Sequence, residues 1–308
     1  MTRIVRAAMT ETRNAYIGFP STTAELDAWD ADLDAVRGAN IAHHEDLIAT
    51  AARLNVKAIC LGELCMGPYF ALEERELWRG LAEDAASGPS VTAMCAAARQ
   101  HDMVIVVPIY EHDAVTDTRF NTAVVIDADG SIVGKYRKTH IPYGTNERAS
   151  FLENFYYERS DGNLEGDPAR CGSDPYFPVF TTRVGKVGVA ICYDRHFVGA
   201  MTALARGGAE VVFCPAVTFG AKSERMWQRE FDVDAARLNL FIGGSNRRGV
   251  EPPFDVEYFG QSHFTGPNQR PDPVAAPEGL VVADLNFSEL AGDSSGWDLA
   301  RDARPDIY

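Results

Sequence analysis

Short apolar runs, each about as long as one β-strand, alternate along the chain with segments of helical periodicity. The apolar runs cover residues 4–9, 56–61, 103–110, 186–192, 211–214, 240–245, 259–264 and 280–285. The segments of helical periodicity cover residues 32–54, 91–100, 197–206 and 224–238. Strands that alternate with helices favour a layered α/β sheet fold over a helical bundle or a β-sandwich.

Local signals refine this organisation. Ser90 is predicted to cap the helix over 91–100. Residues 121–136 are typical of a β-hairpin whose turn is Ala128-Asp129-Gly130. The stretch 158–176 is rich in Gly, Asp and Pro and is predicted to be a long loop. Because no linker or repeat stands out, we predict one domain over 1–293 and a tail over 294–308.

Composition and charge exclude several classes of protein. The chain has 308 residues, and its 44 acidic and 29 basic side chains give a net charge of −15. This acidic balance argues against a nucleic-acid partner, because such binding depends on Lys and Arg. The longest apolar runs are far shorter than the roughly 20 residues of a membrane-spanning helix. Six scattered cysteines without a CxxC pair indicate reduced thiols and a cytoplasmic protein.

Four reactive side chains lie in suggestive places. Glu63, Lys138 and Cys192 each come at or just after the end of an apolar run, and Glu153 lies in a loop. Side chains at the carboxyl ends of strands converge in open α/β sheets, so these residues are candidates for one site. Each also has a plain structural interpretation: a solvated turn carboxylate, a surface lysine or a packed core thiol.

The strings around these residues resemble the nitrilase superfamily of carbon–nitrogen hydrolases. Lys-Tyr-Arg-Lys-Thr-His-Ile-Pro contains Lys138, and Ile-Cys-Tyr-Asp-Arg-His-Phe contains Cys192. Gly-Gly-Ser-Asn-Arg at 243–247 and the last eight residues also look like family segments. The resemblance implies a four-layer α-β-β-α sandwich that pairs into homodimers or larger homo-oligomers, with the tail reaching toward the partner. It implies that Glu63, Lys138 and Cys192 form the catalytic triad and that Glu153 assists them.

The chemistry expected of a Glu, a Lys and a Cys side chain brought together in this way is acyl transfer. Glu63 would take the proton of the Cys192 thiol, and Lys138 with the backbone N–H of Tyr193 would stabilise the tetrahedral intermediate. Two departures from the family pattern bear on substrate range rather than reaction type. Val198-Gly199 replaces the usual Pro-Glu, and a loop as long as 158–176 can reshape the mouth of the site.

Substrate choice is expected to depend on Arg195, with His196 as a second donor. The branch that the chain resembles acts on N-carbamoyl amino acids, and there the matching arginine holds the substrate's carboxylate. An ion pair, for instance with Asp194, is the structural alternative for Arg195. We therefore expect hydrolysis of an N-carbamoyl-β-alanine-like acid. An aliphatic amidase or nitrilase with the same triad, or a catalytically idle scaffold, are the alternatives.

We infer no metal and no cofactor. His43-His44-Glu45 contains two metal-ligand residue types. However, neighbouring residues on a helix point in different directions, so this segment is interpreted as a solvated helix face.

Overall fold

Two β-sheets form the centre of the molecule. The computed structural model describes residues 2–163, 166–291, 299–304 and 306–307. The seven-stranded sheet has the order β15 (Pro273–Val274), β16 (Leu280–Asn286), β1 (Ile4–Thr10), β2 (Ala58–Cys60), β3 (Val104–Asp113), β4 (Thr118–Ile126) and β5 (Ile132–Arg137). The five-stranded sheet has the order β14 (His263–Thr265), β11 (Phe241–Asn246), β10 (Val211–Ala216), β9 (Gly185–Val189) and β8 (Phe180–Thr182). Strands β1, β2 and β3 run parallel to one another, as do β9, β10 and β11.

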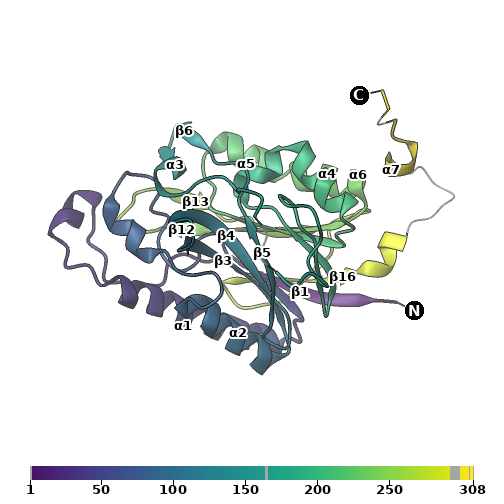
Figure 1. The fold of residues 1–308 in the computed structure, drawn as a ribbon, viewed down its shortest axis with the longest axis horizontal. Coiled ribbons are helices and arrows are strands. Elements are labelled where there is room, and N and C mark those ends of the chain that lie inside the picture. Colours follow the sequence, from purple (N-terminus) through teal and green to yellow (C-terminus); the bar gives the residue numbers. More distant parts are fainter. Residues whose placement is uncertain (1, 164–165, 292–298, 305, 308) are drawn as a thin grey trace.

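Helices cover the outer face of each sheet, so the molecule has four α-β-β-α layers (Figure 1). One helical layer consists of α1 (Leu33–Arg53) and α2 (Pro89–His101). The other consists of α4 (Val198–Arg206), α5 (Ala221–Trp227) and α6 (Glu230–Leu238). The remaining elements are short: α3 (Glu153–Tyr156), α7 (Leu299–Asp302), the β6–β7 and β12–β13 hairpins (Tyr143–Thr145 with Ser150–Leu152, Arg248–Val250 with Glu257–Phe259), and the 3₁₀ turns η1 (Thr23–Ala28), η2 (Glu76–Leu81), η3 (Cys192–His196) and η4 (Phe287–Ala291).

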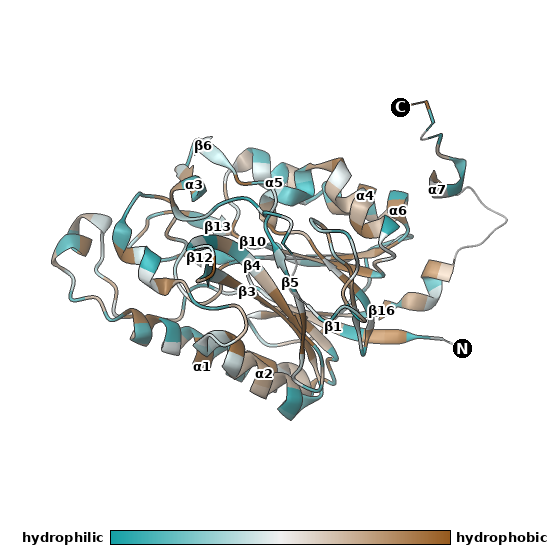
Figure 2. Ribbon diagram, viewed as in Figure 1, coloured by the Kyte–Doolittle hydropathy of each residue, from teal (hydrophilic) through white to brown (hydrophobic). Residues whose placement is uncertain are grey.

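The central strands are buried on both faces, which explains why they are apolar throughout rather than alternating. In β3, Val104 and Val106 pack between the sheets, whereas Ile105 and Val107 pack against the layer of α1 and α2. Figure 2 shows hydrophobic residues concentrated in these strands, whereas the helices outside them carry more polar residues. The predicted four-layer α/β architecture is therefore confirmed.

The predicted cap of α2 is wrong. Gly88 occupies the N-cap position and Pro89 the first helical position, where a missing N–H costs nothing. Ser90 lies one residue further in, and its backbone N–H donates to a carboxylate oxygen of Glu83 at 2.9 Å. A side chain from outside the helix therefore satisfies the helix end.

Two predicted elements are each divided in the structure. The helix predicted over 224–238 is α5 and α6, which are separated by Gln228 and Arg229. The strand predicted over 259–264 is divided between β13 and β14, which belong to different sheets. Gly260 and Gln261 both adopt left-handed backbone conformations, with φ of 65° and 58°, and this turns the chain between the sheets.

The interpretation of residues 43–45 as a solvated helix face is wrong for His44. Its side chain is buried, Nδ1 lies 2.8 Å from the carbonyl oxygen of Asn40, and burial lowers its pKa to about 4. His43 instead contacts the Thr12 hydroxyl at 2.8 Å. Within the described ranges, no three His, Cys, Asp or Glu side chains form a cluster that could hold a metal ion.

The predicted tail, residues 294–308, is described only in part. Residues 292–298, 305 and 308 are not described, and of the tail's secondary structure only α7, near α6, can be placed. In the described part of the chain, none of the helices has the length and apolar character that crossing a membrane requires.

Candidate active site

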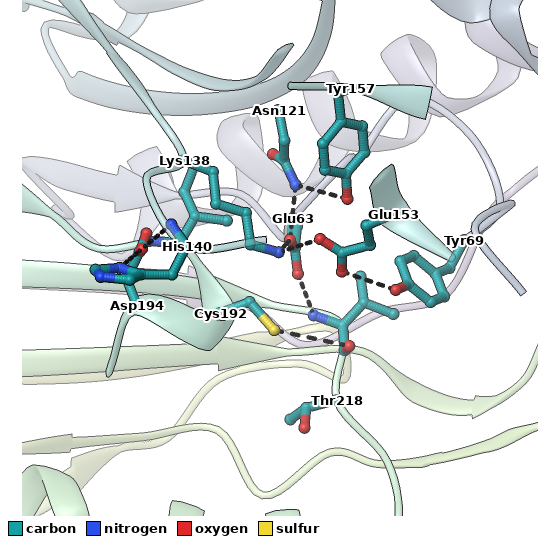
Figure 3. A network of polar contacts seen from close by, with 12 residues as sticks. Glu63, Tyr69, Asn121, Lys138, His140, Glu153, Tyr157, Cys192, Asp194 and Thr218 are labelled. Atoms are coloured by element: carbon teal, nitrogen blue, oxygen red, sulfur yellow. Dashed lines mark hydrogen bonds and ion pairs between the residues drawn. The ribbon is translucent and has the colours of Figure 1, made fainter. Parts of the chain in front are cut away.

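The four predicted residues meet at one edge of the two sheets (Figure 3). Glu63 lies three residues after β2, and Lys138 directly follows β5. Cys192 lies three residues after β9, because that strand ends at Val189 rather than at the predicted residue 192. Glu153, predicted to lie in a loop, is the first residue of α3. All four side chains are at most 7% exposed, so Glu63, Glu153 and Lys138 do not have the solvated positions of their structural alternatives, whereas burial fits both interpretations of Cys192.

Lys138 bridges the two carboxylates. Its Nζ lies 2.8 Å from Oε1 of Glu63 and 2.6 Å from Oε2 of Glu153. Burial alone would lower the pKa of Lys138, but the negative charges of Glu153 and Glu63 raise it above its ordinary value. Lys138 is therefore a permanent cation at neutral pH, and it compensates a pair of buried acids.

Glu63 is held by two further donors. Asn121 Nδ2 donates to Oε1 at 2.7 Å, and the backbone N–H of Val217 donates to Oε2 at 2.7 Å. With Lys138, these contacts occupy both carboxylate oxygens and fix their direction. A carboxylate fixed in this way is preorganised to exchange a proton with a neighbouring group.

Glu153 is the second carboxylate of the cluster. Its Oε1 accepts a hydrogen bond from the hydroxyl of Tyr69 at 2.8 Å. Burial raises the pKa of Glu153, the ammonium of Lys138 opposes this, and the charge of Glu63 adds to it. The two carboxylates thus influence each other across the lysine.

Cys192 begins the turn η3 with a strained backbone. Its φ of 49° lies in the left-handed region, which is uncommon for a residue with a side chain and is frequent at functional sites. The Sγ atom lies 3.9 Å from the carbonyl oxygen of Val217 and 3.7 Å from Nη1 of Arg195. Burial, with the nearby charge of Glu63, raises the pKa of Cys192 to about 12. The sulfur is therefore a thiol at neutral pH and needs a base to become a nucleophile.

Asp194 connects the Cys192 turn to the Lys138 loop. It accepts hydrogen bonds from the backbone N–H groups of Ile191, at 3.0 Å, and His140, at 2.9 Å. The His140 ring, at 2.8 Å, and the Tyr136 hydroxyl, at 2.5 Å, also contact its carboxylate. Asp194 therefore does not pair with Arg195, contrary to the structural alternative considered for that arginine.

Arg195 is buried beside the thiol. Its Nη1 donates to the carbonyl oxygen of Cys192 at 2.6 Å, and its Nη2 lies 3.4 Å from the Thr218 hydroxyl. Its ion pair is with Glu230, at 3.4 Å from Nε, and Glu230 also lies 2.6 Å from Nδ1 of His196. The guanidinium lies over the Trp227 ring at 5.2 Å, which further fixes its direction.

A pocket of about 90 Å³ opens onto these groups. It is lined by Tyr69, Pro142, Asn146, Phe151, Glu153, Cys192, Tyr193, Arg195, His196, Val217, Thr218, Phe219 and Ser223. Sulfur, carboxylate and guanidinium thus border one small cavity, with aromatic rings on its walls. All three residues predicted to bind substrate, Tyr193, Arg195 and His196, belong to this lining.

The long loop lies along the edge strand β5. The N–H of Ser160 donates to the carbonyl of Lys138 at 3.0 Å, and that of Asp167 to the carbonyl of Val133 at 2.8 Å. Asp161 forms an ion pair with Arg137 at 3.1 Å. Of the loop residues that the structure describes, none lines the pocket.

Sequence reasoning missed Tyr69, Asn121 and His140, and assigned Asp194 no role beyond a possible ion pair. Asp194 and His140 stand inside the two strings that were singled out, and their place there is the signal that could have found them. Tyr69 stands six residues after Glu63, in the segment that carries that glutamate, whereas Asn121 carries no such signal. Their roles depend on contacts with residues 58 and 84 positions away.

Comparison with known proteins places this geometry in a family. The Carbon-nitrogen hydrolase family matches residues 31–292. The chain is 32% identical over 279 residues to a beta-ureidopropionase of Arabidopsis thaliana, a match that spans 85% of this chain but only 64% of that protein's length. It is 30% identical over 283 residues to an N-carbamoylputrescine amidase of Solanum tuberosum, across 87% of this chain and 88% of that protein.

A solved structure shares the fold. The carbon-nitrogen hydrolase from Helicobacter pylori G27 superposes with a TM-score of 0.78 at 24% identity, over 99% of this chain and 97% of that one. Only the fold follows from a likeness at this identity.

Proposed function

Because this chain belongs to the carbon–nitrogen hydrolase family, the nitrilase superfamily, we propose that it hydrolyses an N-carbamoyl amino acid resembling N-carbamoyl-β-alanine. The products are the amino acid, carbon dioxide and ammonia. The observation that carries this proposal is the guanidinium of Arg195 beside the Cys192 thiol in one small pocket. Nη1 of Arg195 lies 3.7 Å from Sγ of Cys192, so one small substrate can present its ureido carbon to the sulfur and its carboxylate to the guanidinium.

The first half-reaction places the substrate's acyl group on sulfur. Glu63 takes the thiol proton as Sγ of Cys192 attacks the ureido carbon, and Lys138 with the N–H of Tyr193 stabilises the oxyanion. Glu63 then gives that proton to the departing nitrogen, and one C–N bond breaks. Glu153 assists by keeping Lys138 fixed between the two carboxylates.

The second half-reaction frees the enzyme. Glu63 removes a proton from water, the resulting hydroxide attacks the thioester-like carbon, and the proton returns to sulfur as the C–S bond breaks. The carbamic acid that leaves decomposes into carbon dioxide and an amine or ammonia, depending on which nitrogen left first. Both orders give the same products, and neither needs a redox partner.

Arg195 supplies the proposed specificity. Each terminal nitrogen of its guanidinium carries two N–H groups: Nη1 contacts the carbonyl oxygen and Sγ of Cys192, and Nη2 contacts the Thr218 hydroxyl. Because the contact of Nη1 with Sγ is long, at 3.7 Å, one N–H on each nitrogen can donate to a substrate carboxylate, and a fork of two donors is the geometry that carboxylates prefer. The net charge of −15 disfavours anions at long range, so capture depends on this local donor pair.

Ammonia release from a substrate panel tests the proposal. The panel contains N-carbamoyl-β-alanine, N-carbamoyl D- and L-α-amino acids, carbamoylputrescine, an aliphatic amide and a nitrile, with Cys192→Ala as the control. We expect turnover of the carbamoyl acids that is lost in the variant. Turnover of only carbamoylputrescine, the neutral amide or the nitrile would contradict the proposed substrate, and silence across the panel would favour an idle scaffold.

We also propose that residues 1–293 form the hydrolase domain and that the 294–308 tail contacts a second copy of the chain. Within one chain, α7 of the tail lies near α6, on the outer helical layer. Size-exclusion chromatography of the full chain beside a 1–293 truncation tests this. An unchanged homo-oligomer in the truncation would contradict it.

A further inference from the structure

Another buried ion pair, Arg247 with Glu251, lies outside the pocket that Cys192 lines. Arg247 directly follows β11 and is 4% exposed, and Glu251 is 1% exposed. Nη1 of Arg247 lies 2.6 Å from both oxygens of Glu251. Burying two charges is costly unless their remaining hydrogen-bonding capacity is satisfied, so their other partners indicate what the pair does.

The other terminal nitrogen of Arg247 binds the turn that carries Glu63. Nη2 lies 3.1, 2.8 and 2.9 Å from the carbonyl oxygens of Glu63, Leu64 and Gly67. Leu64 has a φ of 48°, in the left-handed region that side chains disfavour. A turn with such a residue persists only when its surroundings hold it, and Arg247 supplies three of those contacts.

Asn246, which precedes Arg247, holds the loop whose backbone N–H donates to the Glu63 carboxylate. Asn246 Oδ1 accepts from the N–H of Thr218 at 2.9 Å, and its Nδ2 donates to the carbonyl of Thr218 at 3.2 Å. Thr218 follows Val217, whose N–H donates to Oε2 of Glu63. Asn246 thus fixes the loop that orients the carboxylate, and Arg247 fixes the backbone from which that carboxylate projects.

Glu251 connects the ion pair to Glu153 through Tyr69. Its Oε2 lies 3.3 Å from the backbone N–H of Tyr69, whose hydroxyl donates to Glu153. Its Oε1 accepts from the N–H of Asn14 at 2.5 Å. Both carboxylates of the candidate site are therefore connected to this one ion pair.

We infer that Asn246 and Arg247 are positioning residues, which set the direction of the Glu63 carboxylate by holding its backbone turn and its Val217 donor. This inference rests on the proposed function, in which Glu63 is the base for Cys192. The role requires arginine, because a lysine ammonium presents its donors at one point and cannot reach Glu251 and three carbonyls from two separate nitrogens.

Arg247→Lys tests the inference, with Arg37→Lys as the matched control. Arg37 is also buried, pairs with Asp34 at 2.6 Å and donates to the Gly80 carbonyl at 3.2 Å, but it lies on α1, outside the site. One readout needs no substrate: the rate at which iodoacetamide alkylates Cys192 in the full chain between pH 6 and 9, measured by mass spectrometry. Half-buried Cys95 serves as the internal reference.

We expect Arg247→Lys to slow Cys192 alkylation at pH 7 by about tenfold relative to Cys95, and to lower kcat by about 10- to 100-fold with KM within about twofold, as misplacement of a reacting group does. Arg37→Lys should change none of these quantities. If both variants lose only thermal stability and keep the wild-type alkylation profile and kcat, Arg247 is structural and the inference is overturned.

Glu251→Gln keeps the test decisive if Arg247→Lys does not fold. It preserves side-chain volume but turns one acceptor into a donor facing Arg247, Tyr69 or Asn14, so we expect the same changes at smaller size. Unchanged alkylation in a folded Glu251→Gln protein would also overturn the inference. If wild type turns over no carbamoyl compound while these variants still slow alkylation, the proposed substrate fails and the positioning role stands.

Discussion

Asp194 and His140 are joined twice: the backbone N–H and the ring Nδ1 of His140 lie 2.9 and 2.8 Å from the same carboxylate oxygen. The His140 ring also stacks on Phe197, with centroids 3.8 Å apart. Since His140 is two residues from Lys138 and Asp194 two residues from Cys192, this contact sets the distance between the proposed oxyanion cation and the proposed nucleophile.

Asp194→Asn should therefore lower both stability and activity. The carboxylate accepts from four donors, and an amide nitrogen in its place would face some of them without an acceptor. We expect a loss of about 2 kcal/mol in the free energy of unfolding and at least about a tenfold fall in kcat. Urea unfolding and ammonia release measure the two effects.

Asp284→Asn is the control for this change, because Asp284 forms an ion pair with Arg6 on the surface. Such a pair contributes at most about 1 kcal/mol. If Asp194→Asn is no more harmful than Asp284→Asn, the connection between the two loops is unimportant.

Lys138→Met should make stability fall with rising pH. Without the ammonium, two buried carboxylates face each other, and burial with like charge raises the pKa of Glu153 further above its ordinary value. A carboxyl with a raised pKa in the folded state contributes stability below its unfolded pKa and loses it as pH rises. We expect a loss of about 3–5 kcal/mol at pH 7.5 that shrinks toward pH 5, measured by urea unfolding beside wild type. A loss independent of pH would mean that the two acids do not interact through Lys138.

The sequence strings located the proposed catalytic residues because each string keeps its reactive residue at the end of a strand. Glu63 and Lys138 are 75 positions apart, yet the topology alone brings the ends of β2 and β5 to one edge. The same reasoning explains why the alternation of apolar and helical segments was sufficient to predict the layers. The local sequence pattern and the strand order are therefore sufficient to predict the layers and the meeting of these side chains.

The supporting residues could not be predicted in this way. Asn121 lies within a strand, where its amide looks like any polar residue, and its role depends on a hydrogen bond to Glu63 across the sheet. Arg247 looks like the end of a strand, but its partners lie about 180 positions earlier in the chain. Glu230 was not expected beside Arg195, because the break between α5 and α6 that places it is not visible in the helical periodicity.

Arg195→Lys should change affinity for carbamoyl acids more than turnover. A lysine loses the two-donor fork and the contact over the Trp227 ring, so we expect KM for N-carbamoyl-β-alanine to rise about tenfold or more while kcat changes little. KM for a neutral amide should stay nearly constant. Steady-state ammonia release with both substrates measures this split, and equal effects on the two would refute the carboxylate-binding role.

His44 gives the protein a component of stability that depends on pH. Its pKa of about 4 in the folded state lies below its ordinary value because burial disfavours the charged ring. The unfolded chain therefore binds more protons between these two values, and stability falls as pH decreases through this window. Between pH 7 and pH 5 this amounts to about 2 kcal/mol in the free energy of unfolding.

His44→Gln keeps a donor for the Asn40 carbonyl but does not titrate, so its loss of stability over that range should be smaller by this amount. His101→Gln is the matched control, because His101 lies partly exposed at the end of α2. Urea unfolding of the three proteins at both pH values measures the difference, and parallel losses in all three would show that His44 is not the group responsible.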